Sequence, residues 1–428
     1  MALPLLASPA EGEQYRFHFD MSVCIGCKCC EVACNEQNDN PAEIRWRRVG
    51  ELEGGDFPFT KRFHLSMGCN HCVDAACLHG CPVDAYTKSP TNGLVLHNAD
   101  ACIGCQYCVW NCPYGVPQYN EERGVVGKCD MCVGRLEEGR QPACAAACPE
   151  GAIQIEVVNI AEWKQVFAHQ ANAPGMPNAD DTISTTRITL PKDAPALTGG
   201  NSNFVRRESA HWPLVAFLVL SQLSVGGMFF GQGWLAYVLG MLGLSASLLH
   251  LGRPIYAYRA LKMWRRSWLS REVLFFTLFA GAALVSHQLA AAIGLAGVYA
   301  SARIYMVPAR PSWNSLRTLI SFLATTALLG LALAGHPAAV WVALITVASE
   351  VERALWLRNS TEFELHQSGR LLRTELQGLL ALRIILLFGV FLPYALIPLA
   401  ISEIIGRYLF FSSVVPRNMA ATFSAGAA

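Results

Sequence analysis

The chain has 428 residues, of which 53% are hydrophobic and 15% are charged, and its formal net charge is +1. This composition excludes an ordinary soluble protein, in which about a quarter of the residues are charged. The near-zero net charge also argues against a nucleic-acid partner, because nucleic-acid binding depends on a strongly basic surface.

The first part of the chain, up to about residue 160, is rich in short motifs and turns. Met1 to Ala10 is mildly apolar and lacks a basic start, so no cleavable secretory signal is expected there. Tyr15 to Phe19 then follows as a short strand. Beyond it, cysteine motifs alternate with short strands and Gly/Pro turns, which predicts a small α+β domain over residues 1–160.

Sixteen of the 17 cysteines fall into four groups of four. The groups are Cys24, Cys27, Cys30 and Cys34; Cys69, Cys72, Cys77 and Cys81; Cys102, Cys105, Cys108 and Cys112; and Cys129, Cys132, Cys144 and Cys148. The first and third have the C-x2-C-x2-C-x3-C spacing of bacterial ferredoxins, and the other two are stretched variants of it. Since each cubane cluster takes four thiolates, the sixteen cysteines predict four [4Fe-4S] clusters.

The spacing also predicts how the groups share these clusters. In paired ferredoxin motifs, three cysteines of one motif bind one cluster and the fourth binds the neighbouring cluster. Adjacency pairs the second group with the third, which leaves the first to pair with the fourth. The expected sets are Cys24, Cys27, Cys30 and Cys148; Cys34, Cys129, Cys132 and Cys144; Cys69, Cys72, Cys77 and Cys112; and Cys81, Cys102, Cys105 and Cys108. Cys29 breaks the spacing and is expected to be a bystander.

Structural zinc and disulfides are the competing interpretations of so many cysteines. Zinc ribbons use two C-x2-C pairs a dozen or more residues apart, rather than three cysteines within one short loop. Disulfide scaffolds of this density occur in short secreted chains. Iron-sulfur chemistry is therefore favoured.

The rest of the chain divides into a linker and an apolar region. Residues 161–210 are polar and rich in Pro and Gly, which predicts an extended tail and linker. Residues 211–428 contain six apolar stretches, and a membrane helix needs about 20 such residues. The stretches are Leu214 to Phe230, Trp234 to Leu251, Val273 to Ala302, Leu316 to Ala334, Ala338 to Ser349 and Ile384 to Ser402. With their flanks, the third and the last are long enough to be hairpins, so eight helices are preferred and six are the alternative.

The basic residues of this region favour eight helices. If both hairpins form, nearly all the arginines and lysines fall on one face, as the positive-inside rule produces. We therefore expect a multi-pass protein of the inner (cytoplasmic) membrane, surrounded by lipid, with the α+β domain on the cytoplasmic face. The competing interpretation is that these arginines dock the cluster domain and its partner. A partner exported by a twin-arginine signal would place the α+β domain on the periplasmic face.

Several longer motifs carry a resemblance to a known family. Residues 15–160 resemble the four-cluster ferredoxin subunit of the dimethyl sulfoxide reductase family of molybdenum enzymes, through CNHC at 69–72, CIGCQYCVWNCPYGVPQYN at 102–120 and GKCDMC at 127–132. The second half resembles the membrane anchor of that family, through SLLHLGRP at 247–254, SWLSRE at 267–272, ARPSWNS at 309–315 and GRYLFFSSVVPRNM at 406–419. The chain thus resembles a fusion of two subunits, with an α+β ferredoxin-like double bicluster domain followed by an all-α transmembrane helix bundle.

The resemblance implies a non-catalytic electron-transfer and quinone-binding subunit of an oxidoreductase complex. Electrons would pass between menaquinone or ubiquinone, the four clusters and a separate molybdopterin-containing catalytic subunit. The third cysteine group is complete, whereas nitrate reductase relatives carry a tryptophan there, so no three-iron cluster is expected. The cytoplasmic placement slightly favours a sulfite-oxidising type over one that reduces S-oxides or other oxyanions.

A quinone site is expected at the ends of two neighbouring helices. Quinol oxidation releases two protons, so the site needs a hydrogen-bond partner and an ionisable route outward. His250 and Glu272 match the histidine and glutamate that the HLG and SxE motifs of the family place near its menaquinol site. Expected second members are Arg253 and Tyr256, followed by Arg271, Glu350 and Arg383. The alternative is that His250 and Glu272 cap helices or pair with arginines.

Other assignments have less support from the sequence. No haem is expected, because His287 and His336 fall in turns rather than on facing helices at matching depths. A polysulfide-reductase-type membrane module, coupling electron flow to ion movement with another catalytic partner, is the main alternative function. It would need a chain of buried carboxylates, but Glu272, Glu350, Glu352 and Glu403 are all expected near one face. A redox sensor or a purely structural protein would not need sixteen ligands.

Overall fold

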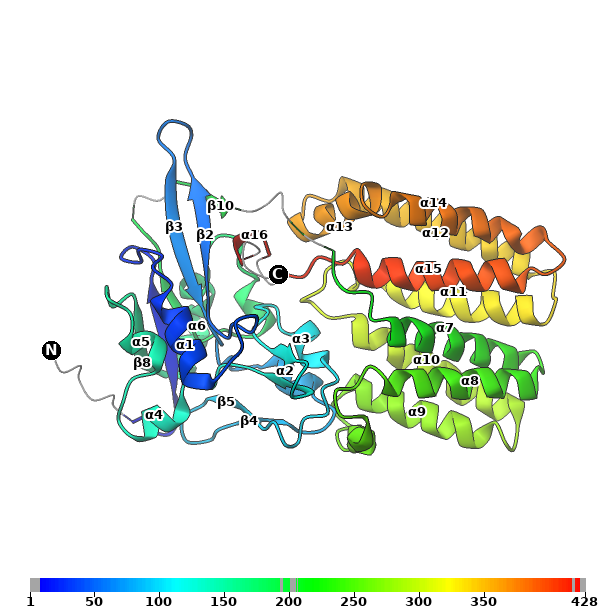
Figure 1. Cartoon of the computed structure of the whole chain (residues 1–428), viewed down its shortest axis with the longest axis horizontal. Helices are drawn as coiled ribbons and strands as arrows, with labels where there is room; N and C mark the ends of the chain where they lie inside the picture. The colour runs from blue at the N-terminus through cyan, green and yellow to red at the C-terminus, as the bar shows by residue number, and fades with distance from the viewer. Residues whose placement is uncertain (1–7, 193–194, 201–204, 206, 418–419, 424–428) are drawn as a thin grey trace. The chain divides into compact units, whose positions relative to one another are not determined.

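The computed structural model describes residues 8–192, 195–200, 205, 207–417 and 420–423. Most of the stretch expected to lack a secretory signal, and Asn418 and Met419 at the end of the last anchor motif, lie outside the described residues. The chain forms two compact units, Met1–Val205 with Pro416–Ala428, and Arg206–Val415. The first is an α+β unit and the second is helical (Figure 1).

The α+β unit is built around a central strand. Strand β1 (Glu13–Asp20) pairs with β8 (Ile153–Asn159) in antiparallel register and with β9 (Arg187–Thr189) in parallel register. Six consecutive residues of β1 are buried, because both of its faces are covered. This strand contains the predicted Tyr15 to Phe19 segment, and it joins three parts of the chain that are far apart in sequence.

A second sheet has the order β10 (Leu197–Gly199), β2 (Arg48–Gly54) and β3 (Lys61–Met67), and all its neighbours are antiparallel. Strands β2 and β3 form the long hairpin that projects from the unit in Figure 1. Two small hairpins lie between the later cysteine groups. They are β4 (Tyr86–Lys88) with β5 (Val95–His97), and β6 (Gln118–Asn120) with β7 (Val125–Gly127).

Short helices follow the cysteine motifs and pack in two pairs. Helix α1 (Cys29–Asn38) packs against α5 (Ala143–Ala146), and α2 (Ala76–Gly80) packs against α3 (Tyr107–Asn111), while α4 (Val133–Glu137) stands between the two halves of the last motif. The first cysteine group is thus beside the fourth, and the second is beside the third. The nested pairing of the cysteine groups stays a prediction, and these helix contacts support it.

The predicted domain boundaries differ from the observed units at both ends of the helical region. Residues 161–205, expected to be a tail and linker, belong to the α+β unit. They contain α6 (Ile160–Gln170), the 3-10 turn η1 (Ala179–Asp181), β9 and β10. Trp163 is buried there, and its Nε1 donates to the carbonyl of Ser184 at 2.8 Å. The Pro and Gly content suggested a linker. The sequence did not reveal the strands of this segment, because their partners are distant in sequence.

The end of the chain also belongs to the α+β unit rather than to the anchor region. Short helix α16 (Ala420–Phe423) contacts β2, and the Arg48 guanidinium lies over the Phe423 ring at 4.6 Å. Arg417 forms an ion pair with Asp181 at 3.3 Å. In sequence, the helical unit is therefore an insertion between two parts of the α+β unit.

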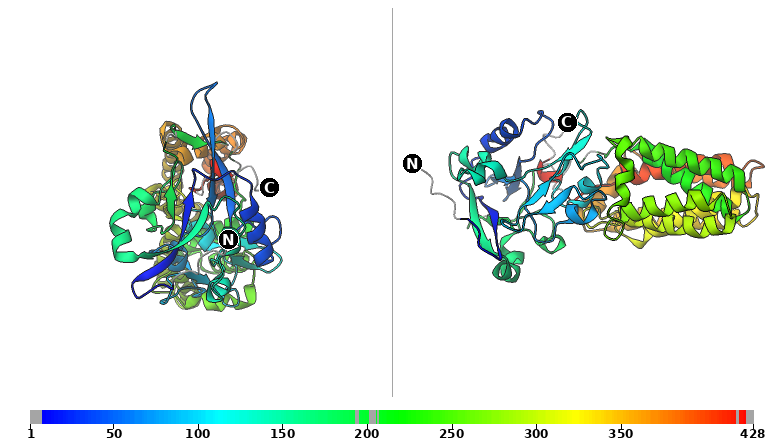
Figure 2. Two further views of the ribbon diagram at one scale, coloured as in Figure 1. Left: turned by 90° about the vertical axis from the view of Figure 1, so that its left-hand side faces the viewer. Right: turned by 90° about the horizontal axis from the view of Figure 1, so that it is seen from below.

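The helical unit consists of helices that lie side by side (Figures 1 and 2). They are α7 (Trp212–Phe229), α8 (Gly233–Leu248), α9 (Trp268–Ala282), α10 (His287–Tyr305), α11 (Leu316–Leu333), α12 (Ala339–Asn359), α13 (Phe363–Arg373), α14 (Gln377–Leu387) and α15 (Leu396–Ser412), with 3-10 segments η2 (Pro254–Leu261) and η3 (Phe388–Phe391). Helix α7 packs against α8, α10, α11 and α15. Gly226 and Gly330 allow α7 and α11 to approach closely, since a Cβ on either would meet the backbone of the other helix.

Each of the two long apolar stretches divides into two helices. The first breaks between α9 and α10, and the second breaks between α14 and α15. By length and composition, α7 and α11 are the described helices that could each cross a bilayer. A third span is added if α13 and the segment Gln377–Phe391, which meet at a bend of 73°, count as one. The expected α+β domain followed by an apolar helical region is confirmed at this level.

Candidate functional site

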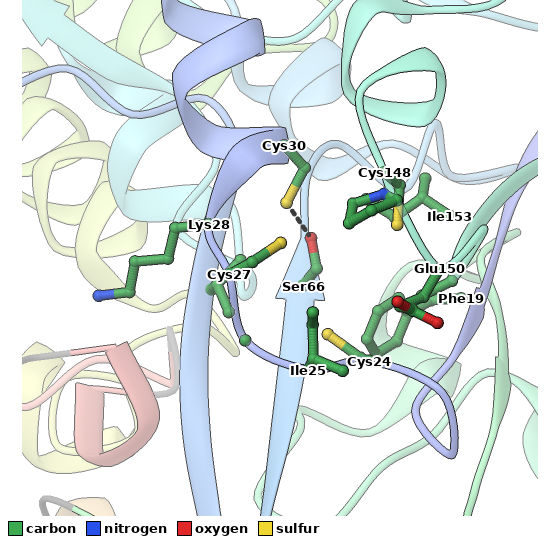
Figure 3. Close-up of a pocket in the computed structure, with 14 residues that line it drawn as sticks. Phe19, Cys24, Ile25, Cys27, Lys28, Cys30, Ser66, Cys148, Glu150 and Ile153 are labelled. Atoms are coloured by element: carbon green, nitrogen blue, oxygen red, sulfur yellow. Dashed lines mark hydrogen bonds between the residues drawn. The ribbon is translucent and has the colours of Figure 1, made fainter.

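Four cysteines from distant motifs line one pocket of the α+β unit. Cys24 and Cys27 come from the segment that leads into α1, Cys30 lies in the first turn of α1, and Cys148 comes from the segment that follows α5. They line a pocket of about 330 Å³, and Figure 3 shows their sulfur atoms directed toward a common space. The Oγ of Ser66 on β3 lies 3.4 Å from the Cys30 Sγ. We call this group the first site.

A second pocket, of about 380 Å³, has a similar set of sulfur atoms. It is lined by Cys69, Cys72, Cys77 and Cys112. These residues come from the second and third motifs, beside helices α2 and α3. Lys128 also lines this pocket. We call this group the third site, and its four cysteines give it the same donor atoms as the first.

The motif spacing assigns the remaining eight cysteines to two further groups, and the thiol charges that act on one member of each come from the expected partners. After burial, the charges of Cys129, Cys144 and Cys132 raise the pKa of the Cys34 thiol. Likewise, burial and then the charge of Cys105 raise the pKa of Cys108, with Cys102 and Cys81 adding to the shift. We call Cys34, Cys129, Cys132 and Cys144 the second site, and Cys81, Cys102, Cys105 and Cys108 the fourth site.

The loops at the start of the motifs share one backbone geometry. The N–H two residues after the first cysteine points at that cysteine's sulfur, at 3.4 Å for His71, Gly104 and Met131. The donor residue has a positive φ in each case, which is 69° at Gly104, 43° at His71 and 63° at Met131. Glycine adopts such angles freely, whereas His71 and Met131 hold them at a cost of about 1–3 kcal/mol each. Strain concentrated at these turns is typical of functional loops.

Burial makes the free thiols of these sites weak acids. It raises the pKa of Cys72 and of Cys132 to about 12, because a buried thiolate loses its hydration. Thiolates therefore form here only if positive charge enters the sites. Iron in the sites would supply such charge, and soft thiolates are the ligands that iron-sulfur clusters use.

Two buried cations already lie among the sulfur atoms. Arg47 is 2% exposed, and its Nη1 donates to Ser66 Oγ at 3.1 Å, while its Nε and Nη2 have no hydrogen-bond partner among the described residues. Lys128 is 3% exposed, with its Nζ 3.8 Å from Cys69 Sγ and 2.8 Å from the carbonyl of Cys129. The remaining donors of Arg47 fit a guest that carries acceptor atoms, as the sulfides of a cluster do. Sequence reasoning missed both residues, although Lys128 stands directly before Cys129.

The predicted quinone-site residues are distributed over one end of the helical unit. His250 follows α8, and Arg253 and Tyr256 lie at the start of η2. The Arg259 guanidinium lies over the exposed Tyr256 ring at 4.1 Å. Glu272 is buried on α9, with 7% exposure, where α9 packs along α10.

A residue that the sequence did not single out lies beside His250. The ring of His211, just before α7, meets the His250 ring edge-on with centroids 5.3 Å apart. His211 has a φ of 48°, a strained angle for a non-glycine residue, and its ring also contacts Phe411 of α15. Its only sequence signal is its place at the start of the first apolar stretch.

A network of buried charges joins helices of the same unit. Arg383 of α14 lies 3.2 Å from Glu350 of α12 and 3.5 Å from Glu403 of α15. Arg407 of α15 donates to Gln222 of α7 and to a threonine hydroxyl of α11, each at 2.9 Å. Glu350 and Arg383, two further candidates for the quinone site, are thus brought together.

The carboxylates of the helical unit, which the sequence expects near one face, differ in their burial. Glu272, Glu350 and Glu403 are all buried, at 7%, 8% and 1% exposure, whereas Glu352 is exposed and pairs with Arg317. The sequence did not predict the link between Glu350 and Glu403, because the arginine that joins them lies on a third helix.

The cysteine sites and the apolar helical unit define an iron-sulfur protein with a membrane anchor. Residues 60–158 match a 4Fe-4S dicluster domain, and residues 232–341 match the DMSO reductase anchor subunit (DmsC). A component of the anaerobic dimethyl sulfoxide reductase of Haemophilus influenzae is 36% identical over 202 residues, which are 45% of this chain and 97% of the relative. The protein therefore belongs to the family of this reductase component, here fused to an anchor domain of the DmsC type.

Two other relatives show the range of the family. A component of the anaerobic dimethyl sulfoxide reductase of Escherichia coli K12 is 44% identical over 177 residues, covering 40% of this chain and 85% of the relative. A component of the sulfite dehydrogenase of Allochromatium vinosum is 38% identical over 154 residues, covering 31% of this chain and 64% of the relative. The resemblance expected from the motifs is confirmed.

Proposed function

We propose that this protein relays electrons between a quinone in the membrane and a separate molybdopterin-containing catalytic subunit. The observation that supports the proposal is that two sets of four cysteines, each drawn from two motifs, line two pockets of the α+β unit, and the other eight cysteines have the spacing of two further sets. Each group would hold one [4Fe-4S] cluster, which takes up and releases a single electron. The protein itself would be a carrier and an anchor, and the substrate chemistry would belong to the partner.

The chain's own residues would prepare these sites before any electron moves. Backbone N–H groups after the first cysteines, such as that of Gly104, donate toward sulfur and stabilise its negative charge. Buried surroundings shield the sulfur atom of Cys108 from water, and Cys77 and Cys112 are half-buried. Hydrogen bonding and exclusion of solvent are two of the levers by which a protein sets the potential of such a site.

The partner and substrate are proposed from the relatives. The names of two relatives point to a dimethyl sulfoxide reductase and a sulfite dehydrogenase. We infer that the catalytic partner is a molybdenum enzyme acting on a sulfur compound, either reducing an S-oxide or oxidising sulfite. With the α+β unit on the cytoplasmic side of the inner membrane, the sulfite-oxidising type remains our preference.

The quinone would bind in the helical unit, which we propose to cross the membrane with eight helices. His250 would donate to or accept from a quinone oxygen, and Glu272 would take up a released proton. Arg253 and Tyr256 would complete the polar surroundings, with His211 beside His250 as an added member.

The buried network of the same unit bears on the alternative function. A module that moves ions needs carboxylates that are free to change charge. Glu350 and Glu403 are instead both held by Arg383. This arrangement supports the electron-relay role over an ion-moving module.

Metal and redox analysis of the anaerobically purified protein tests the proposal. We expect about sixteen irons per polypeptide and the electron paramagnetic resonance signals of reduced [4Fe-4S] clusters. The variant His250→Ala should slow cluster reduction by a menaquinol analogue while leaving the iron content unchanged. Zinc in place of iron would contradict the cluster assignment. Reduction by quinol at the original rate in this variant would contradict the quinone site at His250.

A further inference from the structure

Arg47 and Lys128 differ in their surroundings from the cations of the α+β unit that pair with carboxylates. Arg16, for example, is buried but pairs with Glu156 at 2.7 Å. The described partners of Arg47 and Lys128 are instead a hydroxyl, backbone carbonyls and cysteine sulfur. A buried cation without a carboxylate partner is costly, so its charge must be offset by something else in the assembled protein.

Arg47 lies between the first and second sites. Cys144, Cys30, Cys129 and Cys34 are the thiols whose charges act on it most. It reaches the first site through Ser66, whose Oγ is 3.1 Å from the guanidinium and 3.4 Å from Cys30 Sγ. It is held in place by the Phe17 ring, whose centroid lies 4.4 Å from the guanidinium carbon.

Lys128 lies between the second and third sites. Its Nζ is 3.8 Å from the Cys69 sulfur of the third site, and it also donates to the carbonyl of Cys129 in the second. A further bond to the carbonyl of Val95 on β5 fixes the ammonium group. The lysine is also part of the lining of the third-site pocket.

We propose that Arg47 and Lys128 are built-in counter-charges that raise the reduction potentials of the clusters at the first, second and third sites and act least on the fourth. This inference rests on the proposed function, since it presumes clusters at these sites. When a site gains one electron, no bond forms or breaks and no proton moves, so the added negative charge must be stabilised where it arrives. A fixed cation a few ångströms away does this strongly in a buried, weakly screened environment.

The proposal has a direct test in the full-length, cluster-loaded protein. Redox titration followed by electron paramagnetic resonance would compare Arg47→Gln and Lys128→Gln with the charge-retaining Arg47→Lys and Lys128→Arg. We expect each Gln variant to change the ratio of reduced to oxidised cluster at a fixed potential at least tenfold for one or more couples, toward the oxidised form. Tenfold corresponds to about 59 mV for a one-electron couple. The charge-retaining variants should stay within about threefold of the original protein.

The control is Arg62→Gln, which removes an exposed cation of β3 that pairs with Glu53 at 2.8 Å. It should leave every couple unchanged. Gln variants that keep all their iron and all their potentials would overturn the proposal. If a Gln variant loses a cluster, the iron content of the charge-retaining variant at the same position is compared with it. Iron retained in the charge-retaining variant supports the counter-charge role. Iron lost in both variants overturns that role and shows that the side chain acts by packing. A protein that holds no clusters at all fails the iron analysis first, so the two failures are distinguishable.

Discussion

Both units of this protein bury charged side chains, but they satisfy those charges in different ways. In the helical unit, Arg383 lies between two carboxylates, so the network contains both signs of charge within the unit itself. In the α+β unit, the hydrogen-bond partners of Arg47 and Lys128 are a hydroxyl, backbone carbonyls and cysteine sulfur rather than carboxylates. The comparison teaches that a buried ion pair stabilises the fold of its own unit. A buried cation beside thiols indicates instead that the unit binds a negatively charged cofactor.

Removal of iron should produce the largest difference in stability between the two units. Without clusters, the buried cations of the α+β unit lose the negative charge that offsets theirs. This unit should therefore unfold locally while the helical unit stays folded. Hydrogen exchange after chelation under reducing conditions measures this, and amides of β1 and α1 should exchange far faster than those of α7 and α11. Equal protection in the iron-loaded and iron-free protein would refute the assigned difference.

The next largest effect is expected from breaking the network of the helical unit. The variant Arg383→Met leaves Glu350 and Glu403 buried without their shared cation, which should lower the free energy of unfolding by about 3–5 kcal/mol. Thermal unfolding in detergent would measure the change.

A triple variant provides the control for that loss. Replacing Arg383 by Met together with Glu350→Gln and Glu403→Gln should recover part of the lost stability, because no buried carboxylate then lacks Arg383, while Arg353 loses its ion pair with Glu350 at 3.8 Å. If the triple variant is no more stable than Arg383→Met alone, the side chains contribute by packing rather than by charge.

The sequence predicted the cysteine sites better than the surroundings that support them. Spacing alone grouped Cys24 with Cys148, because the geometry of short ferredoxin loops is local and repeated. It could not place Trp163 in the α+β unit, since the segment around it is held by β9, whose partner β1 lies far earlier in the sequence. Nor could it find Arg47, which lies directly before β2 and has no motif of its own.

A glycine of the first site offers a smaller and more local test. Gly26 has a φ of +71°, and a Cβ there would come within 2.6 Å of the His64 ring. Gly26→Ala should therefore cost more than the roughly 1 kcal/mol expected from the backbone angle alone. Gly151→Ala is the matched control, because its φ is +63° and nothing lies within 4 Å of the added Cβ. Equal losses in chemical unfolding would show that His64 moves aside freely.

The smallest effect is expected at the exposed pair of Arg317 and Glu352. Both side chains are largely open to solvent, at 37% and 55% exposure. Arg317→Met should change the free energy of unfolding by less than about 1 kcal/mol, and added salt should reduce even that. A loss as large as that of Arg383→Met would mean that position in the helical unit, rather than burial, decides what an ion pair contributes.

The packing of Arg417 and of residues 420–423 within the α+β unit has a consequence for biosynthesis. A Cβ on Gly50 of β2 would collide with Thr422 and Phe423, so the strand leaves room for a segment that the ribosome delivers only after the helical region. The cluster-bearing unit therefore cannot finish folding until that entire region has been translated. Iron loading would then be timed to follow membrane insertion, and a nascent polypeptide stalled before residue 416 would present an unfinished surface to the assembly machinery.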